Sequence, residues 1–218
     1  DGKTIDLISI GIVCEDGREL YLCNAECNMG KASDWIWDNV LIPMGVQPAP
    51  DRGKFGGMHP LDDCWVMRNE IVRRLVIFFG IDIVNDSPSL GYAPTLIPGQ
   101  WHFELPADTP KPEIWGNYCA TDWVGFYQLF GRMVDLPKGF PMRCNDLMQE
   151  CDRLGFDQRN IPKENRHNAL EDARWNKRLH EELIRYEQCR EGAKRIYGAA
   201  NGELCVRPSV LNFSLGDK

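Results

Sequence analysis

The chain has 218 residues, enough for one fairly large domain or two small ones, and 43% of them are apolar, so it can bury a proper core. Its net charge of −7 argues against a protein that coats nucleic acid indiscriminately. No apolar run is long enough to span a bilayer, and the first twenty residues lack the basic start and apolar centre of a signal peptide. The composition therefore predicts a soluble protein that is not secreted and does not bind a membrane.

The nine cysteines are an odd number and are scattered along the chain. No pair of C-x-x-C motifs occurs, which argues against a zinc ribbon. Scattered free thiols fit a reducing compartment, so we expect a cytoplasmic protein.

Charge is distributed unevenly. Residues 1–63 carry 11 acidic and 5 basic side chains, whereas residues 159–195 carry 10 basic and 7 acidic ones. A local basic excess can bind phosphates even in an acidic protein, although a solvated helix face is the better explanation for most of these side chains.

The chain is predicted to open with an antiparallel hairpin. Residues 4–13, TIDLISIGIV, are β-branched and apolar on both faces, as in a strand covered on both sides. Asp16-Gly17 is a hairpin turn signal, and residues 20–26 then form the returning strand. A short helix follows over residues 33–42, with Ser33 or Asp34 as its N-cap.

Residues 43–63 are rich in proline and glycine and are predicted to be a loop. Residues 64–80 are predicted to be a helix that ends at Gly80. Its apolar stripe consists of Met67, Ile71, Leu75 and Phe78.

The second half of the chain alternates strand and helix around a proline-rich insertion at residues 84–112. We expect a strand at 113–120 and helices at 121–133, 145–155 and about 168–190, with Thr121 or Asp122 and then Asn145 at the first two helix starts and Gly155 ending the second. The order of elements predicts an α/β fold in which a mixed β-sheet is flanked by α-helices. We expect a single domain over residues 1–195 and a tail of uncertain order over 196–218.

Residues 165–174, NRHNALEDAR, place a histidine five positions before an aspartate. On a continuous helix the two side chains would point about 140° apart, so His167 must precede the helix if it shares a site with Asp172. Pro162 interrupts the preceding stretch, and Asn165 or Asn168 can cap the helix. The alternative is a surface histidine beside an ordinary first-turn acid.

Asp122 is the third residue of interest, because it follows a predicted strand and opens a helix, a junction where ligand sites form in α/β sheets. Carboxylates that converge would repel one another unless divalent cations lay between them, and oxygen ligands suit Mg²⁺ or Mn²⁺. Two such ions about 4 Å apart can promote phosphodiester cleavage, with a nearby histidine as the general base. The alternative role for Asp122 is a helix cap.

The hairpin DGKTIDLISIGIVCEDGRELY, the junction NYCATDWVGFYQLFG and RHNALEDAR together resemble the DEDDh group of 3′-to-5′ exonucleases, which have an RNase H-like fold. The likeness is closest to the polyadenylate-specific exoribonuclease AS branch. It implies that Asp122 and Asp172 are metal ligands, that His167 is the general base and that two Mg²⁺ or Mn²⁺ ions complete the site. It also implies hydrolysis from the 3′ end of single-stranded RNA, with poly(A) as a candidate substrate.

The first acidic motif of that family, Asp-x-Glu, does not occur in residues 1–13, where Asp1 and Asp6 do not form it. We expect the motif to lie just upstream of Asp1, and we expect the sequence as given to bind Mg²⁺ weakly and to lack nuclease activity. An inactive relative is the alternative.

Two other functions remain open at the level of sequence. One is a DNA 3′-to-5′ exonuclease of the same fold, because recognition of the 2′-hydroxyl can depend on a single backbone group. The other is a nucleic-acid-binding module without turnover. The sequence does not determine the oligomeric state, so a homodimer also remains open.

Overall fold

In the computed structural model the chain is described over residues 5–49, 53–84, 102–163 and 167–197. It forms two compact units, residues 1–183 and residues 184–218, which divide within the last helix. The first unit contains all the strands of the described residues and the candidate site. Within the described part of the chain, no helix is long and apolar enough to cross a membrane.

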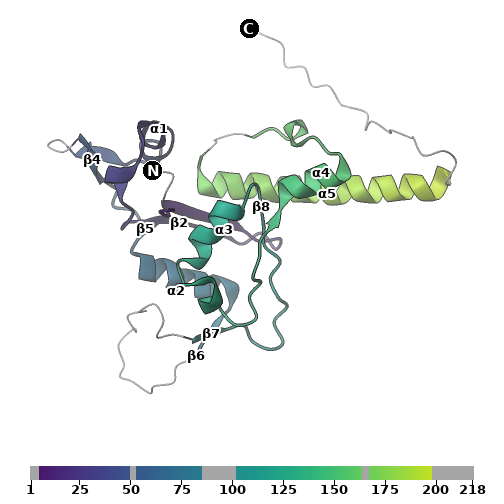
Figure 1. The fold of residues 1–218 in the computed structure, drawn as a ribbon, viewed down its shortest axis with the longest axis horizontal. Coiled ribbons are helices and arrows are strands. Elements are labelled where there is room, and N and C mark those ends of the chain that lie inside the picture. Colours follow the sequence, from purple (N-terminus) through teal and green to yellow (C-terminus); the bar gives the residue numbers. More distant parts are fainter. Residues whose placement is uncertain (1–4, 50–52, 85–101, 164–166, 198–218) are drawn as a thin grey trace, which may run out of the picture. The chain divides into compact units, whose positions relative to one another are not determined.

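The predicted hairpin is confirmed (Figure 1). Strand β1 (Ser9–Val13) pairs antiparallel with β2 (Glu19–Asn24), and Ser9 lies opposite Cys23. The turn includes Gly17, whose φ is 90°. Strand β1 is half-buried along its length, so the prediction that the first strand is covered on both sides is wrong. The buried residues of the hairpin are Leu22, Cys23 and Asn24 of β2.

Helix 33–42 forms as a short α1 (Asp34–Ile36) that continues as a π-helical turn, η2 (Trp37–Leu41). Ser33 is its N-cap, because the Ser33 side chain accepts a hydrogen bond from the Ile36 backbone N–H. A 3₁₀ turn, η1 (Met29–Lys31), precedes it.

The prediction of a loop over residues 43–63 is wrong in part, because this segment contains two short strands that pair antiparallel. Strand β3 (Gln47–Ala49) pairs with β4 (Gly53–Met58). A second core lies beside this pair and includes Trp37 and Leu41, both fully buried, together with Val46.

Helix α2 (Arg68–Phe79) starts four residues later than predicted. The chain before it forms β5 (Trp65–Val66), which pairs parallel with β2 and gives the three-stranded sheet the order β1-β2-β5. The helix start is set by a distant residue, because the Arg68 backbone N–H donates to the Glu26 carboxylate at 2.6 Å. Gly80 ends the helix in the left-handed region, as predicted.

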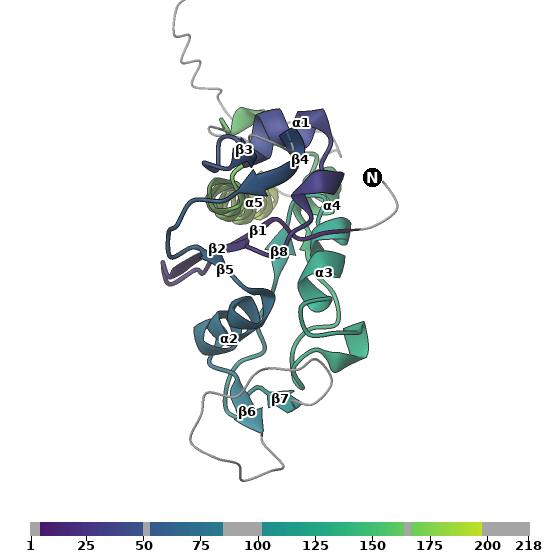
Figure 2. The ribbon, with the colours of Figure 1, turned by 90° about the vertical axis from the view of Figure 1, so that its left-hand side faces the viewer.

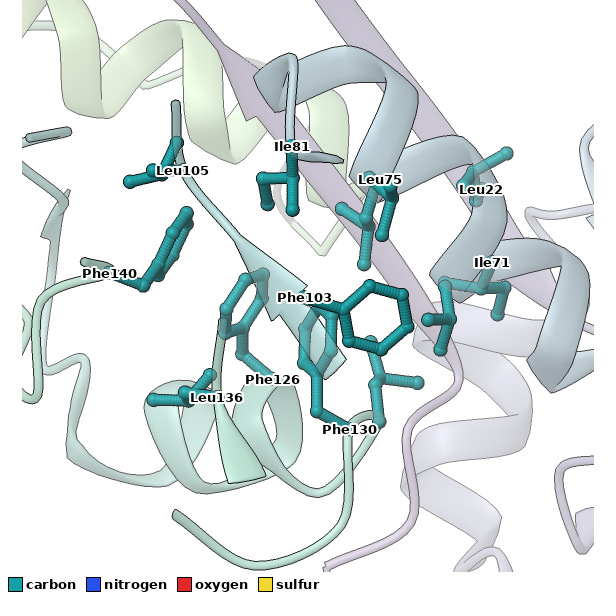
Figure 3. Packing of buried hydrophobic residues seen from close by; sticks show 13 residues of the cluster. Leu22, Ile71, Leu75, Ile81, Phe103, Leu105, Phe126, Phe130, Leu136 and Phe140 are labelled. Atoms are coloured by element: carbon teal, nitrogen blue, oxygen red, sulfur yellow. The ribbon is translucent and has the colours of Figure 1, made fainter. Parts of the chain in front are cut away.

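The predicted stripe of α2 is only partly correct. Ile71 and Leu75 are fully buried, but Met67 lies before the helix and is 53% exposed. The main core joins α2 to strand β7 (His102–Glu104) and to helix α3 (Ala120–Tyr127). In Figure 3, Phe103, Phe126 and Phe130 point toward one another beside Leu75.

The proline-rich insertion lies largely outside the described residues, which hold only its two ends. Strand β6 (Asp82–Val84) pairs antiparallel with β7 (His102–Glu104). Phe103 is buried in the main core.

The strand expected at 113–120 is reduced to β8 (Trp115–Gly116) because Tyr118 takes a left-handed conformation, with φ of 52°, and breaks the extended run. Helix α3 (Ala120–Tyr127) is shorter than predicted and follows Cys119 instead of starting at Thr121. A 3₁₀ turn, η3 (Met133–Asp135), follows it.

Strand β9 (Asn145–Asp146) pairs parallel with β8. Asn145 is therefore part of a strand, and Asp146 caps α4 (Leu147–Leu154) by accepting a hydrogen bond from Met148 N–H at 2.8 Å. The prediction of Asn145 as the cap is wrong, whereas Gly155 ends the helix as predicted.

After a 3₁₀ turn, η4 (Gln158–Asn160), the chain enters α5 (Ala169–Tyr197), which is longer than the predicted helix. Its first half buries Trp175, Leu179 and Leu183. The predicted tail lies outside the described residues from 198 onward.

The described elements form a mixed α/β structure in which the strands make one three-stranded sheet and three two-stranded pieces. The α/β class is therefore correct, while the strands do not form one continuous sheet among the described residues.

Candidate active site

The candidate residues lie at the starts of two helices. Asp122 is in the first turn of α3, and Asp172 is in the first turn of α5. His167 lies two residues before α5, as the sequence predicts, on a turn where its φ is 72°.

The start of α5 is held by its own capping residue. The Asn168 side-chain oxygen accepts hydrogen bonds from the backbone N–H groups of Leu170 and Glu171, at 3.0 and 3.1 Å. Of the two asparagines predicted as caps, Asn168 performs this role, and Asn165 lies outside the described residues. His167 is thus kept out of the helix by a cap at the next residue.

Helix α5 contacts the hairpin at close range (Figure 2). Gly11 of β1 faces the backbone of Ala169 and Leu170, and a Cβ at this position would overlap the Ala169 carbonyl and lie 2.5 Å from the Leu170 nitrogen. Further along the helix, the Lys177 ammonium donates to the Cys14 carbonyl at 2.9 Å. The close packing of Gly11 against Ala169 and Leu170 therefore fixes the position of the helix turn that carries Asp172.

Helix α3 lies against the segment that leads into the same strand. A Cβ on Gly125 would lie 3.6 Å from Ile5 and 4.0 Å from Leu7, which is ordinary contact. Asp122 is three residues, about one turn, before Gly125. Residues 5–11 thus contact both helices that carry the candidate acids.

Asp122 is affected electrostatically by its surroundings and by Asp172. The pKa of Asp122 is raised, first because nearby protein partly desolvates the carboxyl and second because Asp172 places a negative charge close to it. The Asp122 side chain nevertheless remains exposed. An exposed carboxylate next to another carboxylate is the kind of group that a divalent cation neutralises.

The oxygen donor set fits one divalent cation better than two. Mg²⁺ is commonly bound by one or two carboxylates, with waters and substrate phosphates completing its octahedron. Among the described residues, no three His, Cys, Asp or Glu side chains are arranged as a complete metal site. Asp122 and Asp172 could therefore hold a cation only with oxygens from water, phosphate or further carboxylates.

The thiols near Asp122 are poor alternative ligands. Burial raises the pKa of Cys119 and of Cys144, and a negative charge on Asp122 adds to both shifts. Both thiols are therefore harder to ionise than an ordinary cysteine, and metal coordination requires the thiolate.

His167 is exposed and contacts the ring of Trp35 edge to face, with 4.8 Å between the ring centroids. Trp35 comes from α1 and is 53% exposed. Sequence reasoning missed this pairing, because the two residues are more than 130 positions apart. The helical pattern around Trp35 could identify only a surface tryptophan.

Tyr118 is a second residue that the sequence did not identify. It shares with His167 a left-handed backbone, which is costly for residues other than glycine and is often found at functional sites. Its backbone N–H donates to the Asp146 carboxylate at 3.3 Å, and its side chain is 65% exposed. The same Asp146 carboxylate caps α4, so it fixes both the segment that leads into α3 and the start of α4.

Lys163 is the third residue that was missed. Its ammonium nitrogen lies 2.9 Å from Oδ1 of Asp172. The surplus of basic residues over 159–195 was a signal, but it did not indicate which of them meets the acid.

Two proteins named 3′-5′ exoribonuclease, from Mycobacterium tuberculosis strains CDC 1551 and H37Rv, are each 29% identical to this chain over 174 residues. The match covers 80% of this chain and 81% of each relative. No family model matches the chain. The chain is thus similar, over most of its length, to proteins named as exoribonucleases.

Proposed function

We propose that this protein is a metal-dependent 3′-to-5′ exoribonuclease that removes nucleotides from the 3′ ends of single-stranded RNA. The similarity to two proteins named 3′-5′ exoribonuclease, at 29% identity across 80% of the chain, is the observation that carries the proposal. The finer assignments, a DEDDh-type site on an RNase H-like fold and poly(A) as a substrate, rest on the resemblance of the hairpin and of the segments around Asp122 and His167.

The proposed metal ligands are Asp122 and Asp172. Their oxygens suit Mg²⁺ or Mn²⁺, and the charge of Asp172 already raises the pKa of Asp122. The cations, when bound, would neutralise charge on the scissile phosphate and favour ionisation of water. Two ions would need more oxygen ligands than these two side chains supply.

The proposed general base is His167. Its side chain is exposed on a turn ahead of α5, and among the described residues it contacts the ring of Trp35. A neutral imidazole on such a turn can accept a proton from the attacking water and pass it to solvent. Removal of a general base lowers turnover by about 10²- to 10⁴-fold.

The test uses the protein with the expected Asp-x-Glu motif in place and measures turnover on a 5′-labelled single-stranded RNA as a function of Mn²⁺ concentration. His167→Ala should lower turnover by about 10²-fold at every Mn²⁺ concentration, because it removes a proton acceptor. Asp172→Ala should also abolish activity, but high Mn²⁺ should partly restore it, because this change weakens metal binding.

The matched control is His59→Ala. His59 stacks on Trp65 with 5.0 Å between ring centroids, and neither residue is one of the proposed ligands or the proposed base. Its turnover should remain near wild type. Near-normal activity of His167→Ala would show that this histidine is only a surface residue beside a helix cap. Release of internal fragments instead of single nucleotides would refute the exonuclease assignment.

A further inference from the structure

Lys163 is the cationic partner of Asp172 in the described part of the chain. Its ammonium nitrogen lies 2.9 Å from Asp172 Oδ1, and the two side chains are 23% and 33% exposed. This oxygen is itself buried and has no well-aligned hydrogen bond among the described residues. The ion pair therefore supplies the main compensation for a buried carboxylate oxygen.

The position of Lys163 is built into the fold by Trp175, one turn after Asp172 on α5. The lysine nitrogen lies 4.8 Å from the Trp175 ring centroid, a cation–π distance. Trp175 is buried, and its indole N–H donates to the Ile161 carbonyl at 3.1 Å. The segment around Ile161 and Lys163 is thus attached to the first two turns of α5 by three contacts.

This attachment lies next to the candidate base in the sequence. His167 comes four residues after Lys163 and directly before the helix cap Asn168. In the sequence, His167 therefore lies between two residues with defined contacts, Lys163 before it and Asn168 after it.

We propose that Lys163 is an internal counter-ion that competes with the divalent cation for Asp172, and that its release links metal binding to the placement of His167. This inference rests on the proposed function, because it assumes that Asp172 is a metal ligand. An ammonium and a divalent cation on the same carboxylate oxygen repel each other, so binding of one disfavours the other. Linkage makes the effect reciprocal: a lysine that weakens metal binding is itself loosened by the metal.

The first experiment compares Mn²⁺ affinity by electron paramagnetic resonance for wild type, Lys163→Met and Lys177→Met. Methionine keeps much of the apolar stem that packs on Trp175 but removes the charge. Lys163→Met should bind Mn²⁺ about three- to tenfold more tightly, the range expected when a partly exposed ion pair no longer has to be broken.

Lys177→Met is the matched control. It removes the same charge from a nearby position on α5, but Lys177 donates to the backbone carbonyls of Cys14 and Glu15 and not to Asp172. Its Mn²⁺ affinity should stay within about twofold of wild type, because screening weakens distant charges. Lys163→Gln replaces the methionine variant if that protein does not fold.

The second experiment follows the His167 imidazole signals by NMR with and without Mg²⁺. In wild type the signals should change when Mg²⁺ is added, and in metal-free Lys163→Met they should already resemble the Mg²⁺-loaded wild type. A metal-free variant whose His167 signals match those of metal-free wild type would overturn the linkage.

The outcomes distinguish failure of the counter-ion inference from failure of the proposed function. If Mn²⁺ binds wild type and Lys163→Met with equal affinity, or binds the variant more weakly, the counter-ion inference is wrong and the proposed function stands. If Mn²⁺ binds neither wild type nor any variant when the expected Asp-x-Glu motif is in place, the metal-dependent function fails, and the inference fails with it.

Discussion

Gly11 is the position where a one-methyl change should test the architecture of the site most directly. A Cβ added there would overlap the Ala169 carbonyl and lie 2.5 Å from the Leu170 nitrogen, whereas ordinary contact begins at 3.4 Å. Both neighbours are backbone atoms of α5, so no side-chain rotation can relieve the overlap. Gly11→Ala should therefore push the start of α5 away from β1 by about 1 Å.

The expected cost has a structural and a functional part. Overpacking of this kind costs about 1–3 kcal/mol, which corresponds to a fall in Tm of about 2–12 °C for a chain of this size. The displaced turn carries Asp172 and follows His167, and a misplacement of about 1 Å can lower turnover by about 10²-fold. Thermal unfolding by circular dichroism and turnover on single-stranded RNA measure the two parts separately.

Gly192→Ala is the matched control, because Gly192 lies in the same helix and a Cβ added there would meet no heavy atom within 4 Å. This change should raise stability by about 0.5–1 kcal/mol, as expected for glycine to alanine in a helix interior, and leave turnover unchanged. If Gly11→Ala behaves like Gly192→Ala, the close approach of β1 and α5 does not position the site, and the reasoning is wrong.

Two further predictions concern Asp122 and Asn168. The pKa of Asp122 is raised, so the folded state disfavours its ionised form, and the contribution of Asp122 to stability should fall as pH rises from its unfolded pKa through its folded one. Asp122→Asn should lack this contribution, so the variant should be the more stable protein at pH 7 and the difference should shrink at pH 3, as urea unfolding without metal would show. Equal pH dependence of the two proteins would contradict this. Asn168→Ala should cost about 1 kcal/mol through loss of the helix cap and should lower turnover by displacing His167, whereas Asn168→Asp should retain most of both, as thermal unfolding and turnover would show. Unchanged turnover in Asn168→Ala would show that the helix cap does not position His167.

The sequence alone determined the features whose causes lie within a few residues of one another. The β-branched run around the Asp16-Gly17 turn specified the hairpin, and Gly80 and Gly155 specified the ends of α2 and α4. Asn168 likewise places His167 ahead of α5, because a cap needs only the N–H groups two and three residues further on. Each of these signals is local, so it can be recognised without the tertiary structure.

Tertiary structure decided where elements start when a distant partner takes over the backbone. Helix α2 begins at Arg68 because Trp65 and Val66 pair with β2 and because the carboxylate of Glu26, 42 residues earlier, accepts the Arg68 N–H. The strand before α3 is short because Tyr118 is held in a left-handed conformation beside Asp146, 28 residues later. Local propensity contains no information about such partners.

The candidate site divides in the same way. Sequence identified Asp122, His167 and Asp172 by their positions at helix starts, but their environment depends on contacts that only the folded chain makes. Desolvation and then the charge of Asp172 raise the pKa of Asp122. That charge is near because α3 and α5 both contact residues 5–11, and Gly11 allows the second of these contacts. The pairing of Lys163 with Asp172 likewise depends on how the chain turns back onto α5, because side-chain charge is visible in a sequence but the distance between two charges is not.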